Sequence, residues 1–209
     1  IAAMMPQDAV LQERFNAFEG EFDMERTLEV IADFEHAGNH EVLLTEDEEH
    51  PRIRVVIGLD LSGSTAAPVD SGTGAEMVID MEKHFALIFY DAVTALGGNI
   101  DVFGFNSYVG TNIYKPAGRE AMSAFFPDAA NRDGDFIRYV HEHLEQYPDE
   151  ARFFFLISDG LPAAENYSGE EAVKDTAVAM REVVKDRIRL IYINTDPTNN
   201  PDYERFSAE

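Results

Sequence analysis

Short apolar runs alternate with helical patterns of apolar residues from residue 53 to residue 193, and this alternation constrains the fold more than any other feature. Short apolar runs predict buried strands, whereas apolar residues that recur at helical spacing in the segments between these runs predict helices. A strand, helix, strand order favours parallel strands joined by right-handed crossovers. We therefore expect a doubly wound α/β fold, in which helices flank a mostly parallel central sheet. The expected strands are residues 53–59, 100–105, 111–114 at an edge, 153–157 and 188–193, and the expected helices are residues 76–96, 133–146 and 170–185.

The chain is expected to divide into a main domain and two flanking segments. Apolar residues recur at helical spacing between residues 9 and 34, which predicts an N-terminal helical extension. The acidic run at residues 46–49 is typical of a solvated linker. Because the sequence does not start with Met, we expect a fragment or a processed product. The expected division is residues 1–50 for the extension and acidic linker, 51–197 for the main domain and 198–209 for the tail.

The charge and composition exclude several classes of function. There are 40 acidic and 16 basic residues, for a formal charge of -24, which disfavours binding to nucleic acid or to an anionic membrane surface. Such an acidic coat is also typical of adaptation to high salt, and a halophilic source is our interpretation. The chain contains no cysteine, so any metal must be held by oxygen or imidazole. No apolar run approaches the roughly 18 residues of a membrane-spanning helix, and we expect a cytoplasmic protein.

Polar residues follow two of the predicted strands. Asp60, Ser62 and Ser64 come directly after the first strand, and Asp159 follows the strand at 153–157. Ligands of such sheets bind beyond the carboxyl ends of the strands, where these side chains are expected to converge. Carboxylate and hydroxyl oxygens suit Mg²⁺, with Mn²⁺ or Ca²⁺ as alternatives. The pattern therefore predicts a metal site, although a motif this short also fits a polar turn that caps a helix.

The sequence Asp60-Leu61-Ser62-Gly63-Ser64 resembles the metal-ion-dependent adhesion site of von Willebrand factor type A domains. The loop around Asp159 resembles the second metal loop of that family. Another family loop supplies a threonine, and the similar segment here has Asn131 and Asp133 instead. The resemblance implies a non-catalytic docking domain whose metal keeps one position open for an Asp or Glu of a protein partner. The implied metal ligands are Asp60, Ser62, Ser64, Asn131 or Asp133, and Asp159.

Segments 158–162, 166–169 and 175–176 are similar to one intracellular branch of this family. That branch includes the cobaltochelatase subunit and nitric oxide reductase activation proteins. The resemblance implies a role beside a MoxR-type AAA+ ATPase, with the ATPase or its substrate as the partner. The chain would then be a non-catalytic adaptor of a chelatase or an activase.

Other interpretations start from the same residues. An apolar strand that ends in Asp60 is also found in haloacid-dehalogenase-like Mg²⁺-dependent phosphohydrolases, where that Asp is the nucleophile. Such an enzyme needs a second carboxylate at the position of Ser62, and a lysine motif that neither Lys174 nor Lys185 provides. A structural component of a larger assembly, such as a viral particle, is a further alternative. His141 and His143 are two residues apart on a predicted helix, so we do not expect them to share a metal.

Overall fold

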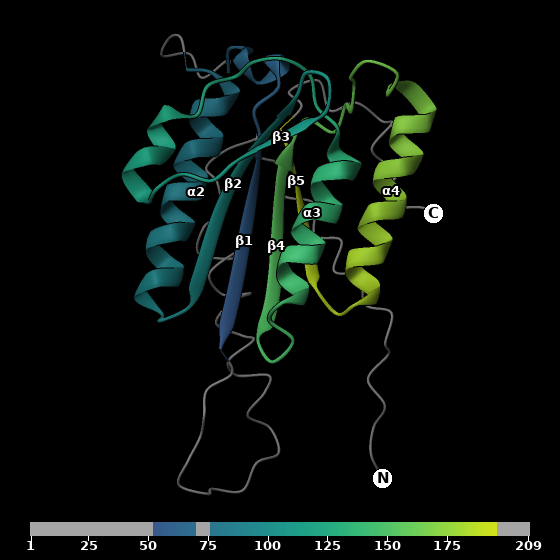
Figure 1. The fold of residues 1–209 in the computed structure, drawn as a ribbon. Helices are drawn as coiled ribbons and strands as arrows, with labels where there is room; N and C mark the ends of the chain where they lie inside the picture. The colour runs from purple at the N-terminus through teal and green to yellow at the C-terminus, as the bar shows by residue number, and fades with distance from the viewer. Residues whose placement is uncertain (1–51, 70–75, 196–209) are drawn as a thin grey trace, which may run out of the picture.

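The computed structural model describes residues 52–69 and 76–195, which form a five-stranded sheet with the strand order β3-β2-β1-β4-β5 (Figure 1). Strands β1, β2, β4 and β5 are parallel, and β3 pairs with β2 in the antiparallel direction at the sheet edge. The predicted doubly wound α/β fold, with a mostly parallel sheet, is confirmed. The strands are β1 (Ile53–Asp60), β2 (Asn99–Ser107), β3 (Thr111–Tyr114), β4 (Ala151–Ser158) and β5 (Arg189–Asn194).

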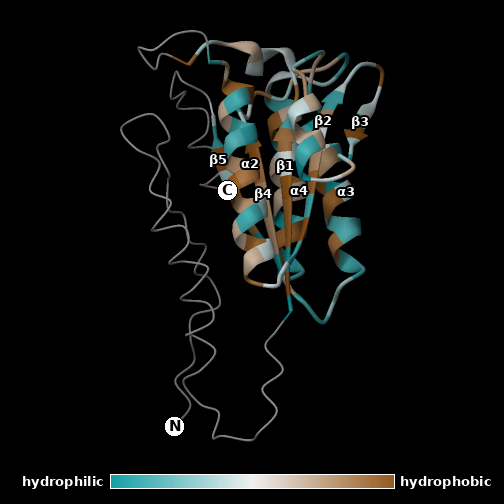
Figure 2. Ribbon diagram, turned by 90° about the vertical axis from the view of Figure 1, so that its left-hand side faces the viewer, coloured by the Kyte–Doolittle hydropathy of each residue, from teal (hydrophilic) through white to brown (hydrophobic). Residues whose placement is uncertain are grey.

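Helices cover both faces of the sheet. Figure 1 shows α2 on one side of the sheet and α3 and α4 together on the other. Figure 2 shows that the strands are mostly hydrophobic, whereas the helices combine hydrophobic and hydrophilic residues. The α-helices are α2 (Val78–Ala95), α3 (Asp133–Glu145) and α4 (Gly169–Lys185), and the 3-10 helices are η1 (Gly63–Ala66) and η2 (Arg119–Ala124).

The central strand β1 contributes to two separate cores because its side chains alternate between the faces of the sheet. Ile57 and Leu59 belong to the core beneath α2, and Val56 belongs to the core beneath α3 and α4. Gly58 lies on the second face, where an added Cβ would overlap the ring of Phe136. The absence of a side chain at this position therefore lets α3 pack closely against β1.

The alternation of side chains along β1 also determines the position of its last residue, Asp60. Asp60 follows Val56 and Gly58 on the face covered by α3, and it is fully buried at the carboxyl end of the strand. The neighbouring strand β4 ends at Ser158, and the two strands run in parallel. The fold thus brings the segments that follow β1 and β4 to the same edge of the sheet.

Element boundaries differ from the predictions by a few residues. Helix α2 begins at Val78 rather than at residue 76, because Met77 has an extended backbone and forms a bridge with Pro68. The expected extension and linker at residues 1–50, the tail at 198–209, and residues 70–75 lie outside the described residues. Within the described ranges, every helix is too short or too polar to cross a lipid bilayer.

Candidate metal centre at the carboxyl edge of the sheet

The segment after β1 holds two serine hydroxyls side by side. The Ser62 amide donates a hydrogen bond to Oδ1 of Asp60 at 2.8 Å, which folds the chain back over the carboxylate. The Thr65 hydroxyl donates to the Ser62 carbonyl at 2.8 Å and closes the first turn of η1. As a result, the Oγ atoms of Ser62 and Ser64 lie 2.9 Å apart, with Ser62 buried and Ser64 exposed. This pair therefore places a buried and an exposed hydroxyl oxygen side by side.

Asp60 is the centre of a buried polar network. Its Oδ2 accepts hydrogen bonds from the Ser158 hydroxyl at 2.9 Å and from Nδ2 of Asn131 at 2.8 Å. The Ser158 hydroxyl also lies 3.4 Å from Oδ2 of Asp133. Residues from the ends of β1 and β4 and from the start of α3 therefore meet at one carboxylate. Ser158, which was not among the residues predicted from the sequence, therefore links the carboxylates of Asp60 and Asp133.

Asn131 uses its whole amide group to position its neighbours. Its Nδ2 donates to Asp60 and, at 3.1 Å, to Oδ1 of Asp133, whereas its Oδ1 accepts the Ala163 amide at 3.0 Å. The orientation of the amide follows from these partners, since the carboxylates require donors and the Ala163 amide requires an acceptor. Of the two candidates for the third loop, Asp133 has a carboxylate, whereas the Oδ1 of Asn131 already accepts one hydrogen bond.

Burial and the neighbouring negative charges raise the pKa values of Asp60 and Asp133. Burial, followed by the charge of Asp159, raises the pKa of Asp60 to about 6. Burial, followed by the charge of Asp60, raises the pKa of Asp133 well above its usual value. The Asp159 carboxylate accepts the Leu161 amide at 3.0 Å, which holds it at the same edge. The ionised forms of Asp60 and Asp133 are thus costly in the metal-free protein.

Glu82 is a fourth buried carboxylate, which sequence analysis missed. It lies on α2, where its Oε1 accepts the Thr195 hydroxyl at 3.0 Å and its Oε2 is buried with no hydrogen-bond partner among the residues that the structure describes. Burial, followed by the charge of Asp60, raises its pKa well above the usual value. One signal was present in the sequence, because Glu82 occupies a position on the otherwise apolar stripe that includes Ile79 and Phe85.

This chemistry fits a hard cation. Within residues 52–69 and 76–195, no lysine or arginine forms an ion pair with the buried carboxylates. A buried carboxylate requires a proton, a hydrogen-bond donor or a cation to offset the cost of its burial. Oε2 of Glu82 has no such partner among the described residues. The donors are all oxygen atoms, which Mg²⁺ and Mn²⁺ prefer. The residues named for this site from the sequence are Asp60, Ser62, Ser64, Asn131, Asp133 and Asp159, and all of them lie at this edge.

Hydrogen bonds connect the start of α3 to α4 and to the loop that precedes α4. Tyr167 is buried, and its hydroxyl donates to Oδ2 of Asp175 at 2.8 Å and accepts the Gly134 amide at 3.3 Å. Arg138 pairs with the same carboxylate through two hydrogen bonds of 2.6 and 3.2 Å. The pKa of Asp175 is lowered, chiefly by Arg138. These contacts hold the first turn of α3, which begins at Asp133, and they bury Tyr167 inside the fold.

Comparison with known sequences identifies a bacterial relative of part of the chain. No family model matches the chain. The chain is 31% identical over 150 residues to uncharacterized protein PA0525 of Pseudomonas aeruginosa, and the alignment covers 65% of this chain. It covers 24% of the relative, so this chain spans about a quarter of that protein's length.

Solved structures share the fold at low sequence identity. Manganese-loaded TRAP protein of Plasmodium vivax has a TM-score of 0.52 and 17% identity, covering 76% of this chain and 63% of that one. The conserved hypothetical protein BatB of Bacteroides thetaiotaomicron has a TM-score of 0.50 and 17% identity, covering 68% and 66%. An aerotolerance-related membrane protein of Bacteroides fragilis has a TM-score of 0.50 and 16% identity, covering 68% and 67%. The described domain therefore has the α/β fold of von Willebrand factor type A-like domains.

Proposed function

We propose that this chain is a metal-dependent protein-docking domain. Mg²⁺, or Mn²⁺ or Ca²⁺ in its place, would be held by Ser62 and Ser64, with Asp60, Asp159 and Asp133 contributing directly or through water. One coordination position would stay open for an aspartate or glutamate of the partner. The observation that carries the proposal is a set of buried carboxylates with no basic partner among the described residues, adjoining a pair of serine hydroxyls of which that of Ser64 is exposed.

Electrostatics favour an acidic side chain as the docking group. A divalent ion would concentrate positive charge at one point of a chain whose formal charge is -24. An approaching carboxylate would be repelled elsewhere on the surface and attracted at this point, which selects both the sign and the place of contact. The manganese in the TRAP protein, which shares only the fold with this chain, is consistent with a metal site on such a domain.

Exposed apolar side chains on neighbouring loops complement the metal. Phe126 is 70% exposed, Val109 is 96% exposed and Leu161 is 46% exposed. Hydrogen bonds connect these loops to the site: Gly63 donates to the Ala129 carbonyl at 2.9 Å, and the Leu161 amide donates to Asp159. The loop of Val109 is joined to the same segment, because the Ser107 amide donates to the Ala130 carbonyl at 2.8 Å. Protein interfaces combine such apolar contacts with a polar group that fixes their register. The partner segment would thus carry an acidic residue beside apolar ones.

The proposed setting is a complex with a MoxR-type AAA+ ATPase, in which the chain acts as a non-catalytic adaptor. This part of the proposal rests on the resemblance of segments 158–162, 166–169 and 175–176 to the chelatase and activase branch. A phosphohydrolase that uses Asp60 as the nucleophile is not favoured by the geometry. The Asp60 carboxylate is fully buried and accepts hydrogen bonds from three groups, which leaves it poorly placed for attack on a phosphate ester.

The direct test measures association with a MoxR-type AAA+ ATPase from the same source, in MgCl₂ and in excess chelator. We expect association in MgCl₂ only, and expect it to be lost in Asp60→Ala. Asp149→Ala removes an exposed acidic side chain elsewhere on the surface and is the matched control. Association that persists in chelator, or that is unaffected by Asp60→Ala, would contradict metal-dependent docking to this partner.

A further inference from the structure

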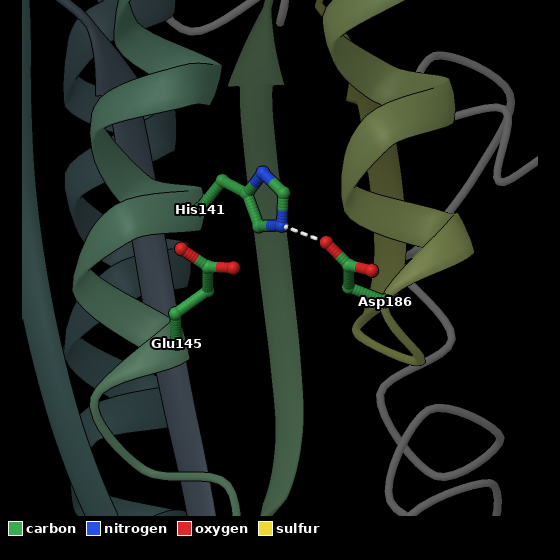
Figure 3. A group of neighbouring side chains, drawn as sticks. All are labelled: His141, Glu145 and Asp186. Carbon is green, nitrogen blue, oxygen red and sulfur yellow. Dashed lines mark hydrogen bonds and ion pairs between the residues drawn. The ribbon is translucent and has the colours of Figure 1, made fainter.

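A second group of potential metal ligands lies away from the carboxyl edge of the sheet. His141, Glu145 and Asp186 each direct one ligand atom into a common space, and these atoms lie within 4.8 Å of one another (Figure 3). At a rise of about 1.5 Å per residue, His141 lies about 12 Å and Glu145 about 18 Å along the axis of α3 from Asp133. The group is therefore separate from the site at the carboxyl edge.

The secondary structure explains why these residues meet. His141 and Glu145 are four residues apart on α3, so their side chains share one face of the helix. Asp186 directly follows α4, which packs beside α3 on the same side of the sheet (Figure 1). Figure 3 shows the side chains reaching across the space between the two helices, with Nε2 of His141 2.8 Å from Oδ2 of Asp186.

Arg152 fixes the two backbone segments that carry the group. Its Nη1 donates to the Leu144 carbonyl at 3.3 Å, and its Nη2 donates to the Asp186 carbonyl at 2.8 Å. The guanidinium thus ties the last turn of α3 to the segment after α4, while its donors are directed at carbonyl oxygens. Only side-chain adjustments are then needed to close the three ligands around an ion, which lowers the ordering cost of binding.

We propose that His141, Glu145 and Asp186 form a second metal site, which takes a transition-metal ion of the Zn²⁺ class. One imidazole nitrogen and two carboxylate oxygens are ligands that Zn²⁺ accepts at about 2.0–2.2 Å, with water in the fourth position. The His141 side chain is only 14% exposed, whereas that of Asp186 is 47% exposed and leaves the site open to solvent. The imidazole distinguishes this site from the all-oxygen site, which suits Mg²⁺.

An ion at this site would connect α3 to the segment after α4. It would bind the folded protein alone, because Glu145 and Asp186 are 41 positions apart in the chain and meet only when the helices pack. Binding to the native state alone raises the unfolding temperature in proportion to the logarithm of the ligand concentration. Zn²⁺ is therefore expected to act as a structural cross-link between the two helices on this face.

The experiment is a calorimetric titration of ZnCl₂ into Ser62→Ala/Ser64→Ala protein in excess MgCl₂, which keeps the other site out of the measurement. We expect one saturable Zn²⁺ site and a rise in unfolding temperature. Asp186→Asn and His141→Ala should each weaken binding by roughly tenfold or more and remove the thermal shift. Asp186→Asn changes an exposed side chain without altering its size, so it keeps the test valid if His141→Ala does not fold.

His143→Ala is the matched control. His143 lies on the same helix but pairs with Asp101, 3.0 Å from its Nε2, so its loss should leave Zn²⁺ binding unchanged. Absence of Zn²⁺ binding, or binding that survives Asp186→Asn, would show that His141 and Asp186 form an ion pair only and would overturn the proposal. Neither result bears on docking through Mg²⁺, because the background variant already lacks both serines.

Discussion

The metal-free protein is predicted to lose stability as the pH rises. The pKa of Asp60 is 3.8 in an ordinary environment and about 6 in the folded protein. At about 1.36 kcal/mol for each pKa unit, ionisation of this one buried group costs the native state about 3 kcal/mol. Between these two values the folded protein binds more protons than the unfolded chain, so the free energy of unfolding falls as the pH rises. Glu82 and Asp133 shift in the same direction and add to the loss.

The assay is urea unfolding of metal-free protein from about pH 4 to about pH 7.5, in about 1 M KCl to screen the acidic surface. We expect the free energy of unfolding to fall by about 3 kcal/mol or more over this range. Saturating MgCl₂ should recover much of the loss at the upper end, because a bound cation stabilises the ionised carboxylates. A metal-free stability that stays level or rises with pH, or that Mg²⁺ leaves unchanged, would refute the reasoning.

Three further predictions concern single residues and salt. In the metal-free protein at neutral pH, Glu82→Gln should raise the free energy of unfolding by about 1–3 kcal/mol, because burying an amide costs less than burying an unpaired carboxylate. A variant that urea unfolding shows to be less stable would contradict the role given to Oε2. Gly58→Ala should cost about 1–3 kcal/mol, because the new methyl group overlaps the Phe136 ring, and an unchanged urea midpoint would show that α3 can move away freely. The thermal midpoint should rise strongly with molar KCl, as screening relieves the repulsion within a chain of charge -24, and a midpoint insensitive to KCl would count against a halophilic source.

Apolar periodicity predicted most of the fold because it reports burial directly. The run Phe153 to Phe155 lies in β4, which is buried between β1 and β5. The position of Asp60 at the end of β1 was also predictable, since a parallel sheet places such residues at one edge. The start of α2 was not, because it depends on the bridge between Met77 and Pro68, which are nine positions apart.

The finer arrangement of the candidate site depends on contacts between distant loops. The sequence left Asn131 and Asp133 as equal candidates, and only tertiary packing shows that the Ala163 amide donates to the Asn131 oxygen. Glu82 escaped notice because nothing local relates α2 to the end of β5, where Thr195 meets its carboxylate. Spacing along the chain identifies residue types near an edge, whereas the hydrogen-bond partner of each polar atom is determined by tertiary packing.

The central claim is that the paired serines and buried carboxylates bind a divalent cation. The most direct measurement is a calorimetric titration of metal-stripped protein with MgCl₂ and MnCl₂, repeated on Ser62→Ala/Ser64→Ala and on Ser123→Ala. Ser123 is an exposed serine on η2, and its hydroxyl donates to the Glu120 carbonyl. We predict one saturable site in the unmodified chain and in Ser123→Ala, and none in the double variant. Absence of binding to the unmodified chain, or equal binding by all three proteins, would contradict the account.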